Sequence, residues 1–289
     1  MSLVQPVKNF SLASKKKLRD KHLMPRIHLG LYQTSGRETS EAVTAALEAG
    51  YRGFDSAEWY GNEEAAGRAI GRFIENNTQG VKREHIWFTT KLKTNSTYDE
   101  TKEAIEDSIE RSGLGYLDLY LLHSPYGGPE ARAECWKAVE DAIEERLIRS
   151  GGVSNFGLKH MKEFIQSNPR YMPSVNQIEV HPFNTRPELV EYCKSYGVTI
   201  EAYAPLAKGM RMKDPTILSL SKHYGCTPAQ LMIRWSLQHG YMPLPKSTKK
   251  ERIISNAQIG SFEITDADME TMDNLDEYLI TDWDPTDCE

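Results

Sequence analysis

The chain has 289 residues, four cysteines and a formal net charge of −6 at neutral pH. This length suits one large domain or two average ones, and the acidic balance argues against nucleic acid as the main partner. The cysteines lie far apart without a CxxC pair, as expected for reduced thiols of a cytoplasmic protein rather than for a disulfide framework. No apolar run is long enough to span a bilayer and there is no signal peptide; the polar stretch 1–17 is expected to be a flexible start.

Short apolar runs and helical segments alternate along the chain. Lys17–Ile27 contains two short alternating pieces, which predict a small β-hairpin that could plug the bottom of a barrel. Strands are expected at His28–Tyr32, Arg52–Asp55, Ile86–Lys91, Leu117–His123, Arg149–Ser154, Ser174–Glu179, Thr199–Ala204 and Met242–Leu244. Helices are expected at Ser40–Ala49, Asn62–Asn76, Tyr98–Arg111, Pro129–Glu145, Leu158–Gln166, Pro187–Tyr196, Pro215–His223, Pro228–Gln238, Lys250–Ala257 and Asp266–Glu277.

Eight strand–helix pairs predict a (β/α)8 TIM barrel of the α/β class, with an N-terminal β-hairpin and extra C-terminal helices. No linker divides the chain, so residues 1–289 are expected to form a single domain. An open doubly wound sheet is the structural alternative, but it would carry GxGxxG after its first strand. The segment Gly30–Gln33 has no such motif. If a nicotinamide cofactor binds, its phosphates must be held elsewhere.

Four candidate catalytic residues follow or end neighbouring strands: Asp55, Tyr60, Lys91 and His123. Neighbouring strand ends of a closed parallel barrel converge on one mouth, where barrel enzymes keep their chemistry. Taken singly, each residue has an ordinary explanation, as a turn cap, a packing aromatic, a surface lysine or a core histidine. Their joint placement favours one active site.

The chemistry of this set suits proton donation to a carbonyl oxygen. A phenol has a pKa of about 10, and an ammonium about 4 Å away at an effective dielectric of about 20 contributes roughly 4 kcal/mol, or about 3 pKa units. Desolvation opposes this lowering, so the net shift is expected to be smaller. Asp55 would keep Lys91 charged and in place, and Tyr60 would protonate the oxyanion formed as hydride reaches the carbonyl carbon. His123 would orient the carbonyl.

Three segments carry a resemblance to a known family: GYRGFDSAEWYGNE at 50–63, TTKL at 89–92 and LYLLHSP at 119–125. They resemble the catalytic segments of the aldo-keto reductases, and the resemblance extends from about Leu18 to Asp284. It implies a (β/α)8 barrel, NADPH bound without a Rossmann domain, and reduction of aldehydes or ketones to alcohols. It also implies that Asp55, Tyr60, Lys91 and His123 form the catalytic tetrad.

The same resemblance assigns cofactor positions. Ser154, Asn155 and Gln177 match the family residues that bind the nicotinamide carboxamide, and Tyr203 matches the one that stacks on the nicotinamide ring. Leu206 and Lys208 match the residues that cover the pyrophosphate. Lys246, Ser247, Thr248 and Arg252 match those that hold the 2′-phosphate, and Asn256 matches the one that contacts adenine. A helix start with nearby cations is physically suited to phosphate.

Substrate positions depart further from the family pattern. Tyr32, Lys93 and Ser124 stand where tryptophan or another aromatic residue is common in the family. Trp59 and Phe156 are expected as apolar walls, and Trp283 in the tail could fold over the mouth. The pocket is expected to be open and mixed in polarity, and it does not name a substrate.

Two other functions remain open at this stage. Barrels of this family also serve as nonenzymatic, cofactor-binding regulatory subunits. A metal-dependent hydrolase would show HxH or HExxH spacing, whereas the eight histidines here are scattered. We therefore expect no metal, a small carbonyl substrate as the partner, no membrane contact, and a monomer or weak dimer.

Overall fold

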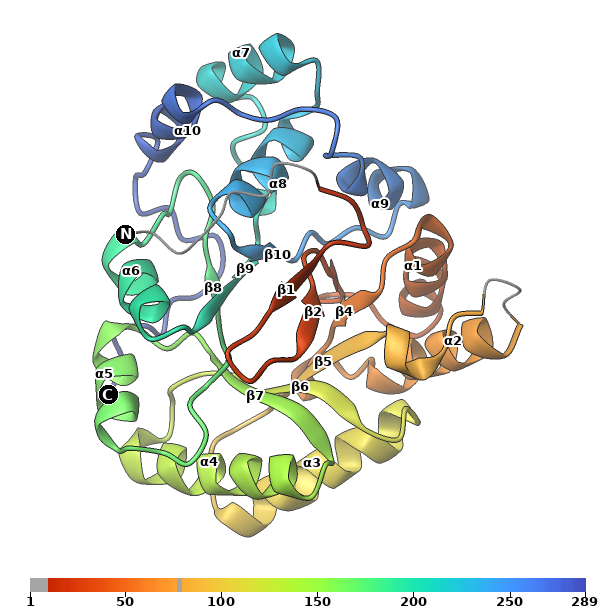
Figure 1. Ribbon diagram of the computed structural model, residues 1–289, viewed down its shortest axis with the longest axis vertical. Coiled ribbons are helices and arrows are strands. Elements are labelled where there is room, and N and C mark those ends of the chain that lie inside the picture. The colour runs from red at the N-terminus through yellow and green to blue at the C-terminus, as the bar shows by residue number, and fades with distance from the viewer. Residues whose placement is uncertain (1–9, 77–79) are drawn as a thin grey trace.

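Eight parallel strands form the centre of the computed structural model, which describes residues 10–76 and 80–289 (Figure 1). Their order in the sheet follows the chain. At the ends of the sheet, His28 N donates to Pro243 O at 3.2 Å and Gly30 forms a parallel bridge with Lys246, so the sheet closes into a barrel. The strands are β3 (Leu29–Gly30), β4 (Gly53–Asp55), β5 (Trp87–Leu92), β6 (Leu117–Leu122), β7 (Ile148–Ser154), β8 (Val175–Glu179), β9 (Thr199–Tyr203) and β10 (Met242–Pro243).

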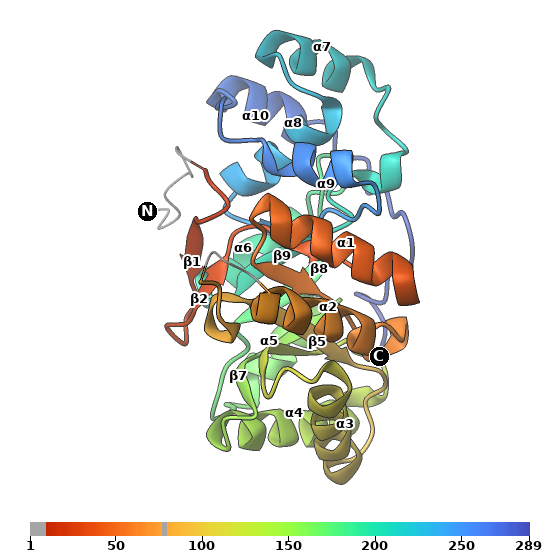
Figure 2. The ribbon, with the colours of Figure 1, turned by 90° about the vertical axis from the view of Figure 1, so that its right-hand side faces the viewer.

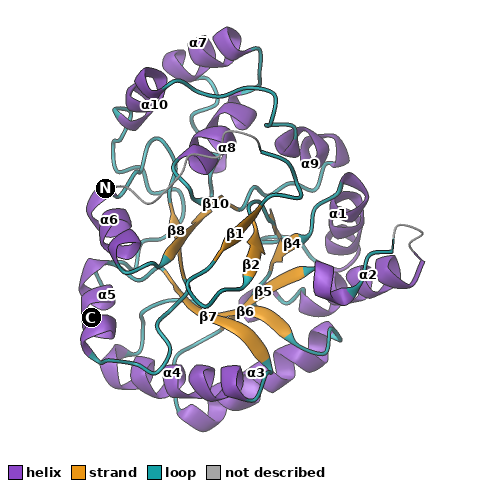
Figure 3. Cartoon of the chain, in the orientation of Figure 1, coloured by secondary structure: helices purple, strands orange, loops and turns teal. Residues whose placement is uncertain are grey.

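Helices surround the barrel (Figure 3). They are α1 (Gly36–Ala49), α2 (Glu63–Asn76), α3 (Tyr98–Ser112), α4 (Gly128–Glu144), α5 (Leu158–Gln166), α6 (Pro187–Ser195), α7 (Pro215–Tyr224), α8 (Pro228–Gln238), α9 (Lys250–Ala257) and α10 (Asp266–Asp273). The expected (β/α)8 barrel, with its hairpin and additional C-terminal helices, is confirmed. The expected last helix is too long, because after Asn274 the backbone of Glu277 and Leu279 hydrogen-bonds to Phe183 O instead of continuing the helix.

The hairpin closes one end of the barrel. Strand β1 (Lys15–Lys17) pairs antiparallel with β2 (Leu23–Pro25), and Leu18 and Met24 pack with inward-facing strand residues such as Trp87. Figure 2 shows the hairpin at one end of the barrel and the last residues of the chain at the other. Residues 1–9 of the expected flexible start lie outside the described residues. Over Lys15–Lys17 that expectation is wrong, because strand pairing fixes this segment.

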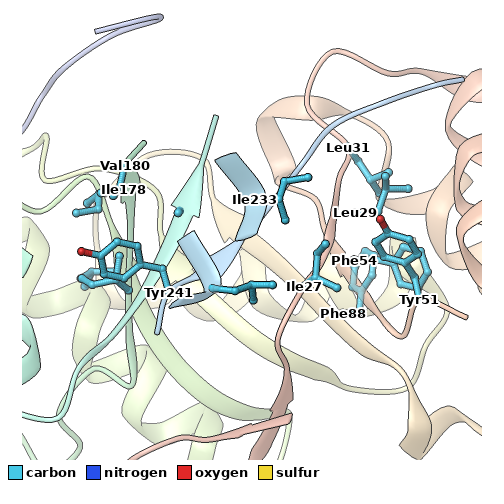
Figure 4. Close-up of a cluster of buried hydrophobic side chains, with 14 of the residues drawn as sticks. Ile27, Leu29, Leu31, Tyr51, Phe54, Phe88, Ile178, Val180, Ile233 and Tyr241 are labelled. Atoms are coloured by element: carbon cyan, nitrogen blue, oxygen red, sulfur yellow. The ribbon is translucent and has the colours of Figure 1, made fainter. Parts of the chain in front are cut away.

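Alternation along the strands separates the barrel interior from the layer beneath the helices. In β6, Leu119 and Leu121 face the interior, whereas Tyr120 and Leu122 belong to the outer core. Figure 4 shows part of this outer core, where Phe54 and Phe88 from adjacent strands gather beside Tyr51. Every residue of β5 and β6 is buried, which is typical of parallel strands covered on both faces.

Two further observations bear on the sequence-based expectations. Within residues 10–76 and 80–289, no helix is long and apolar enough to cross a membrane. All four cysteines are free thiols, and Cys135 and Cys193 are buried.

Candidate active site

The four candidate catalytic residues meet at the mouth of the barrel opposite the hairpin. Asp55 ends β4, Tyr60 ends a short 3-10 turn (Glu58–Tyr60), Lys91 lies in β5 and His123 directly follows β6. The Lys91 Nζ atom donates to Asp55 Oδ1 at 2.8 Å, to Ser56 O at 2.7 Å and to the Tyr60 hydroxyl at 3.3 Å. The ring centroids of Tyr60 and His123 are 5.8 Å apart. The tetrad is therefore assembled in the structure.

The charges of the tetrad are set by burial and by the Lys91–Asp55 pair. Burial disfavours the ammonium of Lys91, which is fully buried, but Asp55 and Tyr60 outweigh this effect and raise its pKa above the usual value. Burial likewise raises the pKa of Tyr60 to about 12, against the lowering effect of Lys91. The net lowering expected from the sequence is thus wrong, because desolvation of the phenolate outweighs the nearby ammonium. Tyr60 keeps its proton at neutral and mildly alkaline pH.

His123 is neutral at the same mouth. Burial, and next the positive charge of Lys91, hold the pKa of the imidazole well below its usual range. The ring lies edge-on to both Tyr60 and Trp283. A neutral ring here can hydrogen-bond to a carbonyl oxygen without adding a charge.

Below the tetrad lies a polar layer that the sequence reasoning only partly identified. Gln177 Nε2 donates to Asp55 Oδ2 and to Glu201 Oε2, both at 2.8 Å. Glu201 Oε1 lies 3.3 Å from His28 Nδ1. Glu201 pairs in register with Gln177 and stands two residues before Tyr203 on β9, so the two-residue period of a strand would have placed it inside the barrel. His28 had no comparable signal.

A cavity of about 1440 Å³ runs from the tetrad to the start of α9. This exceeds the roughly 300–1,000 Å³ of sites for single drug-sized ligands, so it has room for a dinucleotide beside a small substrate. The expected site residues that line it are Tyr32, Asp55, Trp59, Tyr60, Lys93, His123, Ser124, Ser154, Asn155, Gln177, Tyr203, Leu206, Lys208, Lys246, Ser247, Arg252, Asn256 and Trp283.

Three expected residues do not line the cavity. Lys91 is fully buried, and its Nζ atom lies 3.3 Å from the Tyr60 hydroxyl. Phe156 is fully buried against Phe164 and His160, so its assignment as a wall of the substrate pocket is wrong. Thr248 is not part of the lining, whereas its neighbour Ser247 is.

The residues expected around a nicotinamide ring form a hydrogen-bonded group at the ends of β7, β8 and β9. Ser154 Oγ donates to Gln177 O at 2.9 Å, and Asn155 Nδ2 donates to His123 O at 3.0 Å. The Tyr203 hydroxyl donates to Asn155 Oδ1 at 2.8 Å, which fixes the aromatic ring at the cavity wall. These contacts bring polar side chains and an aromatic ring together in one part of the cavity lining.

The opposite end of the cavity is cationic. Arg252 is exposed, lines the cavity, and makes no ion pair within the described part of the chain; the same holds for the Lys246 side chain. Lys250 instead pairs with Glu48 at 2.7 Å. The sequence reasoning missed the first turn of α8, where Thr227, with Pro228 and Ala229, completes the lining at this end.

The rim joins several loops. Lys208 Nζ forms an ion pair with Asp282 of the tail at 2.9 Å, next to Trp283, which packs 5.6 Å from Tyr126 between ring centroids. Asn95, which was missed, donates to the backbone carbonyls of Ser124 and Tyr126 at 2.8 and 2.7 Å and so ties two loops together. The tail and the loop after β9 are thus linked across the mouth.

A parallel barrel with a buried Lys–Asp pair beside a phenol, at one end of a cavity that is cationic at the other, is the arrangement of a barrel oxidoreductase. Among the described residues no group of three or more His, Cys, Asp or Glu could hold a metal ion.

Comparison with known proteins identifies the family. The model of the aldo/keto reductase family matches residues 26–277, and the chain belongs to this family of oxidoreductases. It is 45% identical over 274 residues to an uncharacterized oxidoreductase of Schizosaccharomyces pombe, covering 95% of this chain and 98% of the relative. It is 39% identical to a glyoxal reductase of Bacillus subtilis, covering 92% and 94%.

Solved structures agree with this assignment. An aldo-keto reductase of Bombyx mori in complex with NADP has a TM-score of 0.86 at 32% identity, covering 94% of this chain and 95% of that one. An aldo-keto reductase from a deep-sea metagenome library has a TM-score of 0.89 at 33% identity, covering 96% of this chain and all of that one.

Proposed function

We propose that this protein reduces aldehydes or ketones to alcohols with NADPH, using Tyr60 as the general acid. The single observation that carries the proposal is the contact of the buried Lys91 ammonium with both Asp55 and the Tyr60 hydroxyl. Bound NADPH would supply the hydride. The remaining steps belong to the side chains of this chain.

Tyr60 gives its hydroxyl proton to the carbonyl oxygen as negative charge develops there. Its raised pKa means that the phenol is fully protonated before the reaction, and Lys91, 3.3 Å away, stabilises the phenolate that remains. Asp55 keeps the ammonium aimed at the hydroxyl. Neutral His123, whose ring lies 5.8 Å from that of Tyr60 between centroids, orients the carbonyl oxygen.

The cofactor would lie along the cavity. Ser154, Asn155 and Gln177 would hold the carboxamide, and the ring of Tyr203 would stack on the nicotinamide. Leu206 and Lys208 would lie over the pyrophosphate, although Lys208 is now paired with Asp282. Asn256, which is buried at the far end, would contact adenine.

The preference for NADPH over NADH rests on Lys246 and Arg252. A 2′-phosphate brings roughly two negative charges, and these two cations, which form no ion pair with other described residues, line the far end of the cavity. Ser247, whose hydroxyl accepts from Lys249 N at 3.1 Å, shapes the turn between them. An acidic chain offers no general attraction for phosphate, so this local cluster would be the discriminating element.

The test is oxidation of NADPH and of NADH by the purified protein with a panel of aldehydes, ketones and sugars. Turnover with NADPH is expected for at least one carbonyl class and should survive EDTA. Cofactor binding without turnover of any carbonyl would favour the nonenzymatic regulatory subunit, which the intact Tyr60–Lys91 contact argues against. We further propose that the protein acts in the cytoplasm as a monomer or weak dimer.

A further inference from the structure

Three buried side chains beneath the tetrad form a chain of contacts, and two of them, His28 and Glu201, have no part in the proposed chemistry. His28, Glu201 and Gln177 are each at most 2% exposed. The contacts run from His28 Nδ1 to Glu201 Oε1 (3.3 Å), from Glu201 Oε2 to Gln177 Nε2 (2.8 Å), and from Gln177 Nε2 to Asp55 Oδ2 (2.8 Å). This path links the floor of the barrel to the residue that holds Lys91.

The tautomer of His28 follows from the contact that its Nε2 atom makes. Nε2 lies 3.1 Å from Pro25 O, and a carbonyl oxygen can only accept, so Nε2 carries a hydrogen. In the neutral ring Nδ1 is then an acceptor, and it faces a carboxylate oxygen. Neither Nδ1 of His28 nor Oε1 of Glu201 has another hydrogen-bond partner among the described residues. Two acceptors at this distance would repel each other, so a proton lies between them.

That proton belongs on Glu201. The charged groups facing this carboxyl are Asp55 from β4 and Lys91 from β5, which already neutralise each other. The titratable imidazole of His28, which directly precedes β3, faces it as well. With the proton on His28 instead, the interior would hold a second buried ion pair, and removing two more charges from water is costly. Burial, and next the negative charge of Asp55, raise the pKa of Glu201, while burial lowers the pKa of His28. Both shifts favour a neutral acid that donates to a neutral imidazole.

The His28 ring has a slot prepared for it. A Cβ atom on Gly53 would lie 2.1 Å from His28 Cδ2, so only glycine at this position of β4 lets the ring lie there. The ring is thus held between the backbone of β4 and Glu201.

The Gln177 amide is fixed by this arrangement. Both hydrogens of Nε2 are used by oxygens, one of Asp55 and one of Glu201, so the amide cannot turn without placing its own oxygen against Asp55. The carbonyl oxygen Oε1 of Gln177 takes part in neither of these two contacts, and Gln177 lines the cavity. It can therefore accept from the NH2 group of a nicotinamide carboxamide.

We propose that protonated Glu201, hydrogen-bonded to His28, is a positioning residue that locks the Gln177 amide between Asp55 and the nicotinamide site. This inference rests on the proposed function for the identity of the ligand. It adds that the orientation of the nicotinamide ring and the placement of Asp55 are set by a pair on the barrel floor that touches neither cofactor nor substrate.

Two variants separate the pair's role from general packing. In Glu201→Gln the new amide mimics the protonated acid, because its oxygen can accept from Gln177 Nε2 and its NH2 can donate to His28 Nδ1. In Glu201→Met the volume is similar but a Gln177 N–H loses its acceptor. Calorimetric titration with NADP+ and with 2′,5′-ADP, which lacks the nicotinamide half, reads the two ends of the cavity separately.

The Met variant is expected to bind NADP+ about 5- to 150-fold more weakly, as for one unsatisfied buried polar group, and to bind 2′,5′-ADP within about twofold of wild type. The Gln variant should match wild type in the ratio of the two affinities. Equal weakening of both ligands in the Met variant would mean general damage and overturn the proposal. So would wild-type binding of NADP+ by the Met variant, or a Gln variant as impaired as Met.

A second readout needs no ligand. Infrared spectra of the free protein should show the C=O stretch of a protonated carboxylic acid at neutral pH, and Glu201→Gln should remove it. Absence of that band in wild type would overturn the assignment of the proton. If wild-type protein bound neither ligand, the proposed function would fail, while the infrared result would still decide whether the pair exists.

Discussion

Replacing Lys91 with methionine tests the arrangement of the tetrad directly. The Lys91 ammonium lies 3.3 Å from the Tyr60 hydroxyl. At an effective dielectric of about 20, this contact stabilises a forming phenolate by about 5 kcal/mol. If most of it is realised in the transition state, Lys91→Met should lower kcat about 10³- to 10⁴-fold. The assay is kcat at saturating NADPH and carbonyl, and a loss of less than tenfold would refute the argument.

The same change also affects stability, and this needs its own control. Methionine at position 91 leaves the buried Asp55 carboxylate without its ion partner, which should cost about 3–5 kcal/mol in urea unfolding. Adding Asp55→Asn removes the uncompensated charge, so the double variant should regain stability but not kcat. If the double variant regained kcat as well, Lys91 would act only by satisfying Asp55, and its role toward Tyr60 would be excluded.

Four further predictions concern single residues. Tyr60→Phe should lower kcat by about 10²- to 10⁴-fold with NADPH binding unchanged. In wild type, kcat should not fall between pH 6 and 10 because the pKa of Tyr60 is about 12, and a fall in that range would contradict this pKa. His123→Ala should depress carbonyl reduction and spare NADPH affinity, measured by fluorescence titration, whereas an equal loss of both would point to a structural role. Arg252→Ala should weaken NADPH binding about 10- to 150-fold and leave NADH binding nearly unaffected, and equal losses would show that Arg252 supports the loop. Because the pKa of Glu201 is raised by burial, folded protein holds a proton that unfolded protein releases, and this contribution to the unfolding free energy should fall as pH rises above about 4.3, by at most about 1.4 kcal/mol per pH unit. The buried histidines His28 and His123, whose pKa values are lowered, act in the opposite direction below about pH 6.5, so the effect is measured as the difference between the pH profiles of wild type and Glu201→Gln. Parallel pH profiles would argue against a protonated Glu201.

The meeting of the candidate site residues at one end of the barrel could be predicted from the sequence because it follows from local order. Asp55, Lys91 and His123 each stand at or just beyond the end of an apolar run, and parallel strands bring such ends to one face. The hairpin and the number of strand–helix pairs follow from similarly local patterns. No contact between distant segments had to be known for these inferences.

The environment of each group was decided only by the tertiary structure. The pKa of Tyr60 depends on how fully its hydroxyl is removed from water, and this burial reverses the shift that the nearby lysine alone would produce. The sequence predicts Phe156 as a wall of the substrate pocket, but its side chain packs into the outer core beside Phe164. A sequence gives the order of residues along a strand but not the depth at which each lies.

The contact between His28 and Glu201 shows most clearly what the sequence determines and what only the tertiary structure decides. Strand alternation would have placed Glu201 inside the barrel, two residues before Tyr203. Its partner, however, comes from 173 positions earlier in the chain, where the closing of the barrel and the missing side chain of Gly53 leave room for an imidazole. The sequence by itself determined that Glu201 and Tyr203 lie on one face of their strand. Which interior residues share a proton was decided by barrel closure, because only closure sets the distances between side chains of remote strands.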